Sequence, residues 1–328
     1  MKNFIIKRLM LSVVILFFVA MIIYCIMRCM PSSYVETLAI QKSQAPGSKS
    51  YAEWLEQLNA IYHLDVHPIQ GFFMWFVDAI QGNFGDSWQF NVPVLEKFSE
   101  VIWDSFWLSA ISFVLEIVVA IPLGILSARK QYSKTDYAVT VFALIGISLP
   151  SFFFASVLKL IFSVNLGWFD LYGKVGRYYD QLGPFEQFLD VAAHYVLPII
   201  TIFIVSIGGL MRYTRTNMLE VLNSDYIRTA RAKGLSENRV INYHAFRNTL
   251  IPVVTIIGGT LPSLFSGAMV TEMLFQIPGI GYTSYLAMIG GDIPFSMFYM
   301  VFMAVLTLLG TLIADILYAV VDPRIRVN

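Results

Sequence analysis

NSDYIRTARAKGLSENRVINYHAFRNTLIPVV, residues Asn223–Val254, is a basic segment between two apolar stretches. A polar start is followed by about ten helix-favouring residues that end at Gly234. Ser236 can cap a second helix, across whose start Leu235 and Val240 are spaced as a hydrophobic staple. A helix of about ten residues is only about 15 Å long, and this one is too charged to cross a bilayer. The segment therefore predicts a helix-glycine-helix corner on one face of a membrane protein, where a soluble partner can dock.

The composition indicates a membrane protein. The 328 residues are 57% hydrophobic and only 13% charged, and their net charge of zero gives no argument for a nucleic-acid partner. Six stretches are long enough to cross about 30 Å of hydrocarbon. They are Leu9–Met27, Ser105–Ser127, Tyr137–Val164, Ala192–Met211, Thr249–Met273 and Ser296–Val321.

Lysine and arginine predict the orientation. If the N-terminus is cytoplasmic, 15 of the 22 basic residues lie inside, six lie outside, and Lys159 lies within the third span. Since cytoplasmic loops carry the excess of lysine and arginine, both termini and the Asn223–Arg247 loop are predicted to be cytoplasmic. Lys159 is expected to extend toward the interface, and Asp315 to bond to backbone or to an arginine.

The outer connections are unequal. A long loop follows the first span, and within it GFFMWFVDAI, Gly71–Ile80, predicts a short amphipathic helix. The last outer connection contains LFQIPGIGYTS, Leu274–Ser284, and GGDIP, Gly290–Pro294. It has no lysine or arginine, and its glycines and prolines suit irregular backbone that lines a cavity.

The basic segment resembles the EAA loop of type I (MetI-like) ABC-importer permeases. Thr229, Ala230 and Arg231 hold the opening positions, Gly234 the glycine, and Ile251–Pro252 the closing pair. Two opening residues depart from the general pattern, and the glycine-to-proline spacing is longer. Both departures are typical of the B-type subunits of oligopeptide, dipeptide and nickel permeases, which read YIRTARAKGL.

Further motifs in the same order resemble that branch. They are QGNFGDSW (81–88), IPLGILSA (121–128), SLPSFF (148–153), HYVLPIITI (194–202), FQIPGIG (275–281) and ADILYAVVDPRIR (314–326). The resemblance implies an all-α polytopic protein with six transmembrane helices, a type I permease core and a large extracytoplasmic loop after the first helix. The expected division is residues 1–98 for the first helix and loop, 99–321 for the permease domain and 322–328 for a cytoplasmic tail.

The function implied by the resemblance is that of a permease subunit in an ATP-driven importer of the bacterial cytoplasmic membrane, most commonly for oligopeptides or dipeptides. Its implied partners are a homologous second permease, two cytoplasmic ABC ATPases that hold ATP and Mg²⁺, and an extracytoplasmic substrate-binding protein. The sequence has no P-loop, so we expect a transporter subunit that is not itself an enzyme and binds no cofactor.

Candidate site residues fall into two groups. Tyr226, Ala230 and Lys233 are spaced to share the helix face that meets the ATPase, beside Thr229, Arg231 and Gly234. Arg228 and Arg231 can also pair with carboxylates of the ATPase or of neighbouring loops. The expected pathway residues are Glu116, Phe275, Pro278, Gly279 and Gly281.

Other functions fit the sequence less well. A proton-coupled secondary carrier could use Glu116 as its buried titratable group, but no inverted repeat is evident. An intramembrane protease would need a serine-histidine pair, or paired carboxylates at one depth, and the sequence offers neither. A basic loop attracted to anionic lipid is the plain alternative for the corner. His63, Asp65 and His67 could offer metal ligands, but a proline follows, so we interpret them as a turn and expect no metal site.

Overall fold

The computed structural model is helical, and it describes residues 2–29, 34–45, 48–61 and 64–321. Within these ranges there is no strand, and the one isolated bridge pairs Asp86 with Pro93. The predicted tail 322–328 and His63 lie outside the described residues.

The elements alternate long apolar helices with short connecting ones. In chain order they are α1 (Lys2–Arg28), α2 (Tyr34–Ser43), α3 (Tyr51–Ile61), α4 (Pro68–Ile80), α5 (Val94–Arg129), α6 (Lys134–Ser148), α7 (Ser151–Leu158), the π-helix η1 (Lys159–Asn165), η2 (Tyr179–Gln181), α8 (Pro184–Leu222), α9 (Asp225–Ala232), α10 (Glu237–Arg239), the π-helix η3 (Val240–Ala245), α11 (Phe246–Thr260), η4 (Leu261–Phe265), α12 (Met269–Phe275), α13 (Ile280–Ile289) and α14 (Ile293–Val321).

Among the described residues, four helices are long and apolar enough to cross a membrane, and up to six crossings result if each of two bent pairs is one span. The four are α1, α5, α8 and α14. The first bent pair is α6 with α7 and η1, and the second joins Glu237–Leu250 to Pro252–Phe265, with its break inside α11.

The third predicted span, Tyr137–Val164, is not one straight helix. Its two halves are bent by 103° at Leu149 and Pro150. Because a proline disfavours helical backbone in the residue before it, Leu149 is extended (φ −82°, ψ 126°), and Pro150 caps the next helix.

The fifth predicted span, Thr249–Met273, also ends earlier than expected. Helix α11 gives way to a 3₁₀ turn at Leu261, and Gly267 then adopts φ +79° before α12 starts. A left-handed residue cannot continue a right-handed helix, so the glycine ends the span. Helix α12, which contains Glu272, is consequently a separate short helix.

The long loop after α1 is organised by α2, α3 and α4. The predicted helix at Gly71–Ile80 is confirmed as α4, which begins slightly earlier, at Pro68. Its Phe72 and Phe76 rings lie 5.5 and 5.1 Å from the Phe17 ring of α1, both edge to face. This aromatic contact attaches the loop to the first long helix.

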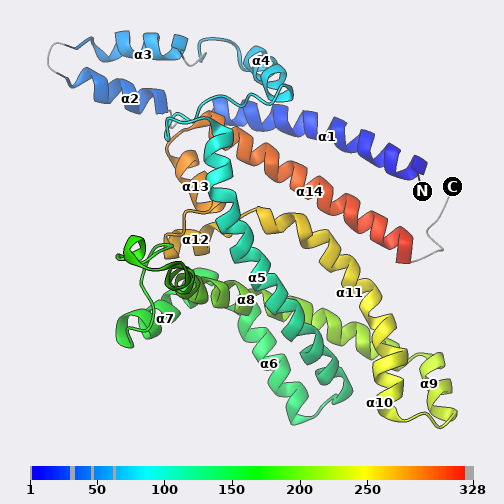
Figure 1. The fold of residues 1–328 in the computed structure, drawn as a ribbon. Helices are drawn as coiled ribbons and strands as arrows, with labels where there is room; N and C mark the ends of the chain where they lie inside the picture. Colours follow the sequence, from blue (N-terminus) through cyan, green and yellow to red (C-terminus); the bar gives the residue numbers. More distant parts are fainter. Residues whose placement is uncertain (1, 30–33, 46–47, 62–63, 322–328) are drawn as a thin grey trace.

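Figure 1 shows how these helices are arranged. Helices α1 and α14 lie side by side, and α5 packs along α8 at the centre. The start of α1, the end of α14 and the α9–α10 corner lie toward the right of the view, whereas α2, α3, α12 and α13 lie toward the opposite side. The two segments singled out in the sequence, Asn223–Arg247 and Phe275–Gly281, are therefore at opposite ends of the helices.

Candidate coupling and pathway site

The basic corner, which we define as Asn223–Arg247, turns where the sequence predicted. Ser224 precedes α9 in an extended conformation, and Lys233 ends the helix. Gly234 follows at φ +77°, and its N–H donates to the Arg231 carbonyl at 2.9 Å. The predicted end of the helix at Gly234 is confirmed, and its left-handed backbone explains the glycine, because other residues adopt this conformation only at a cost.

One side of α9 is packed into the protein. Ile227 and Ala230, three residues apart, are both buried. They belong to an apolar cluster whose other buried members are Ala128, Met218, Val240, Ile241 and Ala245. The prediction that Ala230 shares a partner-facing side with Tyr226 and Lys233 is wrong, because the apolar residues of a short surface helix point inward.

The other side of α9 is open. The Tyr226 side chain is 46% exposed, and Arg228, Thr229, Lys233 and Gly234 are exposed as well. Thr229 uses its hydroxyl inside the helix, donating to the Asp225 carbonyl at 2.9 Å. The corner therefore offers a polar and aromatic surface on a firmly packed helix.

Arg231 is paired within the corner. Its guanidinium donates to both carboxylate oxygens of Glu237, at 2.7 and 3.1 Å, across the Gly234 turn. The Glu237 carboxylate raises the pKa of Arg231. The expected carboxylate partner in the ATPase or a neighbouring loop is therefore not what the structure shows, because Arg231 pairs within its own segment, and the bidentate geometry braces the turn at Gly234.

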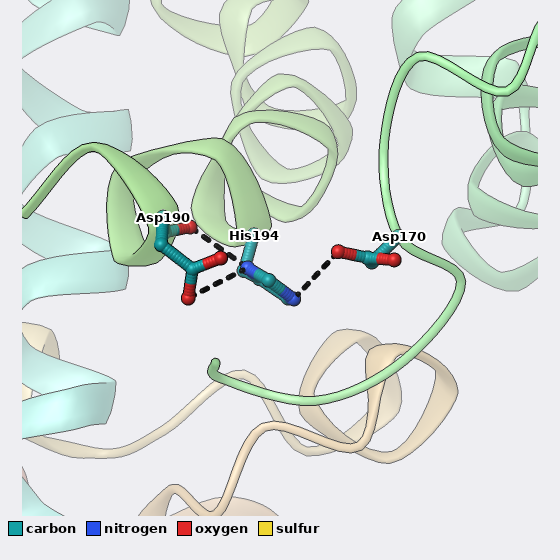
Figure 2. A group of neighbouring side chains, drawn as sticks. All are labelled: Asp170, Asp190 and His194. Carbon is teal, nitrogen blue, oxygen red and sulfur yellow. Dashed lines mark hydrogen bonds and ion pairs between the residues drawn. The ribbon is translucent and has the colours of Figure 1, made fainter. Parts of the chain in front are cut away.

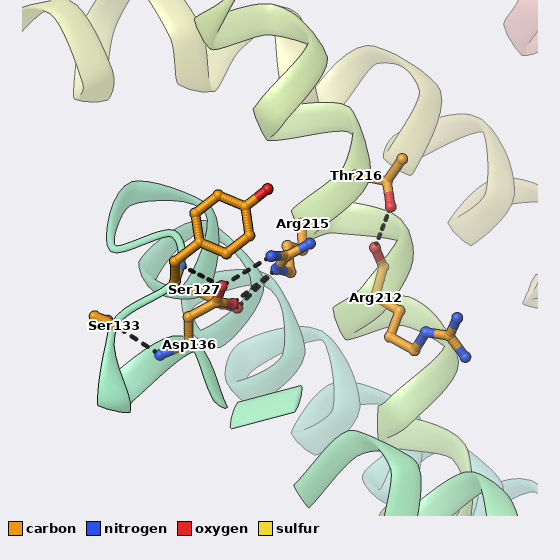
Figure 3. A network of polar contacts seen from close by, with 7 residues as sticks. Ser127, Ser133, Asp136, Arg212, Arg215 and Thr216 are labelled. Carbon is orange, nitrogen blue, oxygen red and sulfur yellow. Dashed lines mark hydrogen bonds and ion pairs between the residues drawn. The ribbon is translucent and has the colours of Figure 1, made fainter. Parts of the chain in front are cut away.

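A polar network attaches the ends of α5, α6 and α8 near the corner (Figure 3). Asp136 receives two bonds from Arg215 of α8, at 2.8 and 2.9 Å, and one from the Ser127 hydroxyl of α5. The Tyr132 N–H also donates to Asp136, at 2.9 Å. Nearby, Arg129 donates to Asn238 of the corner at 2.8 Å. The corner thus contacts the end of α5, which Asp136 joins to α6 and α8.

At the other end, the Phe275–Gly281 turn surrounds a buried carboxylate. Glu272 is 0% exposed and accepts bonds from the Ser105 hydroxyl at 2.7 Å and from the N–H groups of Ala268 and Tyr282 at 2.9 Å each. A β-carbon at Gly279 would lie 2.4–2.5 Å from the Glu272 carboxyl group. The glycine is required because the backbone passes directly over the carboxylate.

This geometry corrects part of the pathway prediction. Phe275, Gly279 and Gly281 are buried in the protein rather than placed on the wall of a cavity, and only Pro278 of the four is exposed. The reason is Glu272, which the sequence reasoning overlooked although it is an isolated carboxylate in an apolar stretch, as Glu116 is. Its hydrogen bonds draw the turn inward.

Asp292 forms a second buried anchor at this end. It is fully buried and accepts bonds from the Ser87 hydroxyl, from the Gln89 N–H at 3.1 Å and from the Phe295 N–H at 3.1 Å. The QGNFGDSW and GGDIP segments, singled out separately in the sequence, are therefore joined through one carboxylate.

Glu116 lines a cavity of about 420 Å³ between α5, α8, α11 and η4. The small or polar residues around it come from three of these elements: Ser206, Gly209, Tyr213, Thr260 and Ser263. None of these was singled out from the sequence, although the spacing of Ser206, Gly209 and Tyr213 puts them on one side of α8. The rest of the lining is apolar, so this cavity, with a few polar groups set in apolar walls, is our pathway candidate among the described residues.

Two isolated charges have specific partners. Asp315 pairs with Arg8 of α1 at 2.9 Å, which confirms the expected arginine partner. Lys159 donates to the Leu274 carbonyl at 2.6 Å and lies over the Tyr172 ring. Its amino group therefore has partners near the end of α12 and in the loop after η1, and its extension toward the interface stays a prediction.

Comparison with known proteins identifies the class. Residues 120–327, more than half of the chain, match the family model for the inner membrane component of binding-protein-dependent transport systems, and the chain belongs to this family. It is 38% identical to the oligopeptide transport system permease protein AppB of Bacillus subtilis, over 99% of this chain and 100% of the relative.

Two further relatives match over nearly their full lengths. The oligopeptide permease protein OppB of Haemophilus influenzae is 32% identical, over 99% of this chain and 100% of its own length. The dipeptide permease protein DppB of Escherichia coli is also 32% identical, over 99% of each chain. Family membership supports a multi-pass permease component and gives no support to a proton-coupled secondary carrier.

Proposed function

We propose that this chain is the membrane-spanning permease subunit of an ATP-driven importer of oligopeptides or dipeptides. The observation that carries the proposal is full-length similarity to peptide permeases, combined with a short helix whose one side is buried and whose other side is open. The partners in this proposal are a second permease, two ATPases that hold ATP and Mg²⁺, and an extracytoplasmic binding protein.

In this proposal the chain crosses the membrane six times, with both termini and the basic corner in the cytoplasm. The lysine and arginine distribution supports this orientation. The expected boundary at residue 99 falls within α5 (Val94–Arg129), so in this proposal the whole of α5 is counted with the permease domain. The segment before Val94 is then the first helix with its extracytoplasmic loop.

The proposed mechanism is a population shift driven by the ATPases. Their closure on ATP brings the two coupling helices of the permease pair together. Because Ile227 is locked into the apolar cluster with Met218 of α8, this movement is passed to α8 and, through Arg129, to α5. Since both helices line the Glu116 cavity, their movement switches its opening from one side of the membrane to the other.

Accessibility labelling tests the orientation. In a background with Cys25→Ser and Cys29→Ser, Ser236→Cys should resist an impermeant thiol reagent in sealed cells and react after permeabilisation. Asp180→Cys, also at an exposed position but in the loop before α8, should react in both. Strong labelling of Ser236→Cys in sealed cells would overturn the topology.

Transport in reconstituted complexes tests the function. Peptide uptake into proteoliposomes should require the binding protein, the ATPases and ATP. Uptake that persisted without ATPases and followed a proton gradient, and that Glu116→Gln abolished, would instead support the carrier.

A further inference from the structure

Three side chains with metal-binding atoms converge where α8 begins (Figure 2). Asp190 and His194 lie one turn apart on α8, and Asp170 comes from the loop after η1. One possible ligand atom from each residue lies within 4.8 Å of the other two. The His194 side chain is 3% exposed, whereas the Asp170 side chain is 67% exposed. The cluster thus joins a buried imidazole to a carboxylate that solvent can reach.

The hydrogen bonding of His194 fixes its tautomer. Its Nδ1 lies 2.7 Å from the Asp190 carbonyl oxygen. A carbonyl oxygen can only accept, so Nδ1 carries the hydrogen and Nε2 presents a lone pair in the neutral ring. Nε2 is buried, has no hydrogen-bond partner among the described residues and points at the Asp170 carboxylate, 3.2 Å away.

The lone pair of His194 Nε2 and the Asp170 carboxylate are both acceptors, and at 3.2 Å they need a positive charge between them. The basic groups of the same loop are engaged elsewhere: Lys174 pairs with Asp104 at 2.7 Å, and Arg177 lies over the Tyr178 ring. The Asp190 carboxylate is held in place by the Gly176 N–H at 2.8 Å. The local charge therefore favours a cation from solution.

We propose that Asp170 and His194, supported by Asp190, bind a divalent transition-metal ion of the zinc type. Imidazole nitrogen and carboxylate oxygen are ligands that Zn²⁺ accepts, and water can complete the coordination on the exposed side of Asp170. A carbonyl on the second ring nitrogen is the usual outer partner of a metal-bound histidine. The site was not foreseen in the sequence, because its ligands are brought together only by the loop.

The ion would fasten this loop to α8 beside the Phe275–Gly281 turn. The same loop reaches that turn through the Gly173 N–H, which donates to the Phe275 carbonyl at 2.8 Å. Asp104 of α5, the partner of Lys174, also accepts a bond from Tyr195 of α8 at 2.8 Å. Metal binding would thus stabilise the contact of the loop with two long helices.

A zinc titration of the purified full-length chain, without a histidine tag and after removal of bound metal, tests the site. The two free thiols are replaced by Cys25→Ser and Cys29→Ser so that they do not bind zinc. We expect about one Zn²⁺ per chain, and Asp170→Asn should weaken binding at least about tenfold, the lower range for even an outer-shell partner. Asp170→His should retain binding, because imidazole replaces the carboxylate as a ligand.

Matched controls separate this site from general effects. Asp180→Asn removes an exposed carboxylate from the same loop, and His67→Gln removes an exposed histidine; neither should change zinc affinity. Thermal unfolding should show that Asp170→Asn is folded. Equal zinc affinity in Asp170→Asn and the parent would overturn the proposal. So would a parent that binds no zinc, which would mean that a proton alone bridges His194 and Asp170.

Discussion

Two glycine turns at opposite ends of the molecule serve different physical needs. At Gly234 in the basic corner, a β-carbon would meet nothing within 4 Å, but the backbone has φ +77°. At Gly279 a β-carbon would collide with the buried Glu272 carboxyl group. The first glycine sets the direction of an exposed helix, and the second permits close packing around a buried carboxyl group. The comparison predicts that a substitution at Gly279 lowers the stability of the fold, whereas a substitution at Gly234 weakens the coupling of transport to ATP hydrolysis.

The largest expected effect follows from Glu272→Ala. It leaves the Ser105 hydroxyl and two backbone N–H groups buried without their acceptor, at a cost of roughly 1–3 kcal/mol for each unsatisfied group. We expect little monodisperse protein on size-exclusion chromatography. Glu56→Ala, at an exposed carboxylate of α3, is the control. Equal yield and melting temperature for the two variants would contradict the role of Glu272 as an anchor.

Gly279→Ala should have the next largest effect on stability. Overpacking costs about 1–3 kcal/mol, and here the added methyl group meets both the Glu272 carboxyl and the Ser105 hydroxyl. Thermal unfolding of the purified chain measures the loss. Gly209→Ala, where a β-carbon has nothing within 4 Å, should melt at the parent temperature or above it. If the two variants have the same melting temperature, close packing is not the reason that a glycine is required at position 279.

Gly234→Ala should cost only about 1–2 kcal/mol, from left-handed strain alone. In reconstituted complexes, however, uptake and substrate-stimulated ATP hydrolysis should fall together, because the helix that meets the ATPase is misdirected. Gly234→Val should have the stronger effect, since its side chain is β-branched. Uptake and substrate-stimulated ATP hydrolysis at the parent level in both variants would show that the angle of the turn does not matter.

Arg231→Glu should have the smallest effect on stability. Exposed ion pairs contribute about 0.2–1 kcal/mol, and the Arg231–Glu237 pair is substantially exposed. We expect weaker docking through loss of positive charge on α9. Adding Glu237→Arg should restore the melting temperature but leave uptake low. Recovery of both would mean that Arg231 acts only by holding the turn.

The sequence predicted local features better than it predicted how they pack. Gly234, the helix before it and α4 were all foreseen, because caps, glycine and amphipathic spacing act over a few residues. The 103° bend at Leu149 was missed because an apolar run does not reveal a break, although Pro150 was its signal. Glu272 was missed because two of its donors, Ser105 of α5 and Tyr282 of α13, are brought to it only by the fold. Ala230 was assigned to the partner-facing side of α9 because it is spaced four residues from Tyr226. Its position three residues from the apolar Ile227 was the better guide, since both are buried.

The most direct test of the account is the side of α9 that meets the ATPase. Tyr226 and Ile227 are adjacent, but the first is 46% exposed and the second is 0% exposed. In the cysteine-free background, Tyr226→Cys should cross-link to the ATPase subunit in assembled complexes, and Ile227→Cys should not. Cross-linking from Ile227→Cys alone, or from neither Tyr226→Cys nor Thr229→Cys in complexes that still transport, would contradict the proposal that this exposed surface is the coupling site.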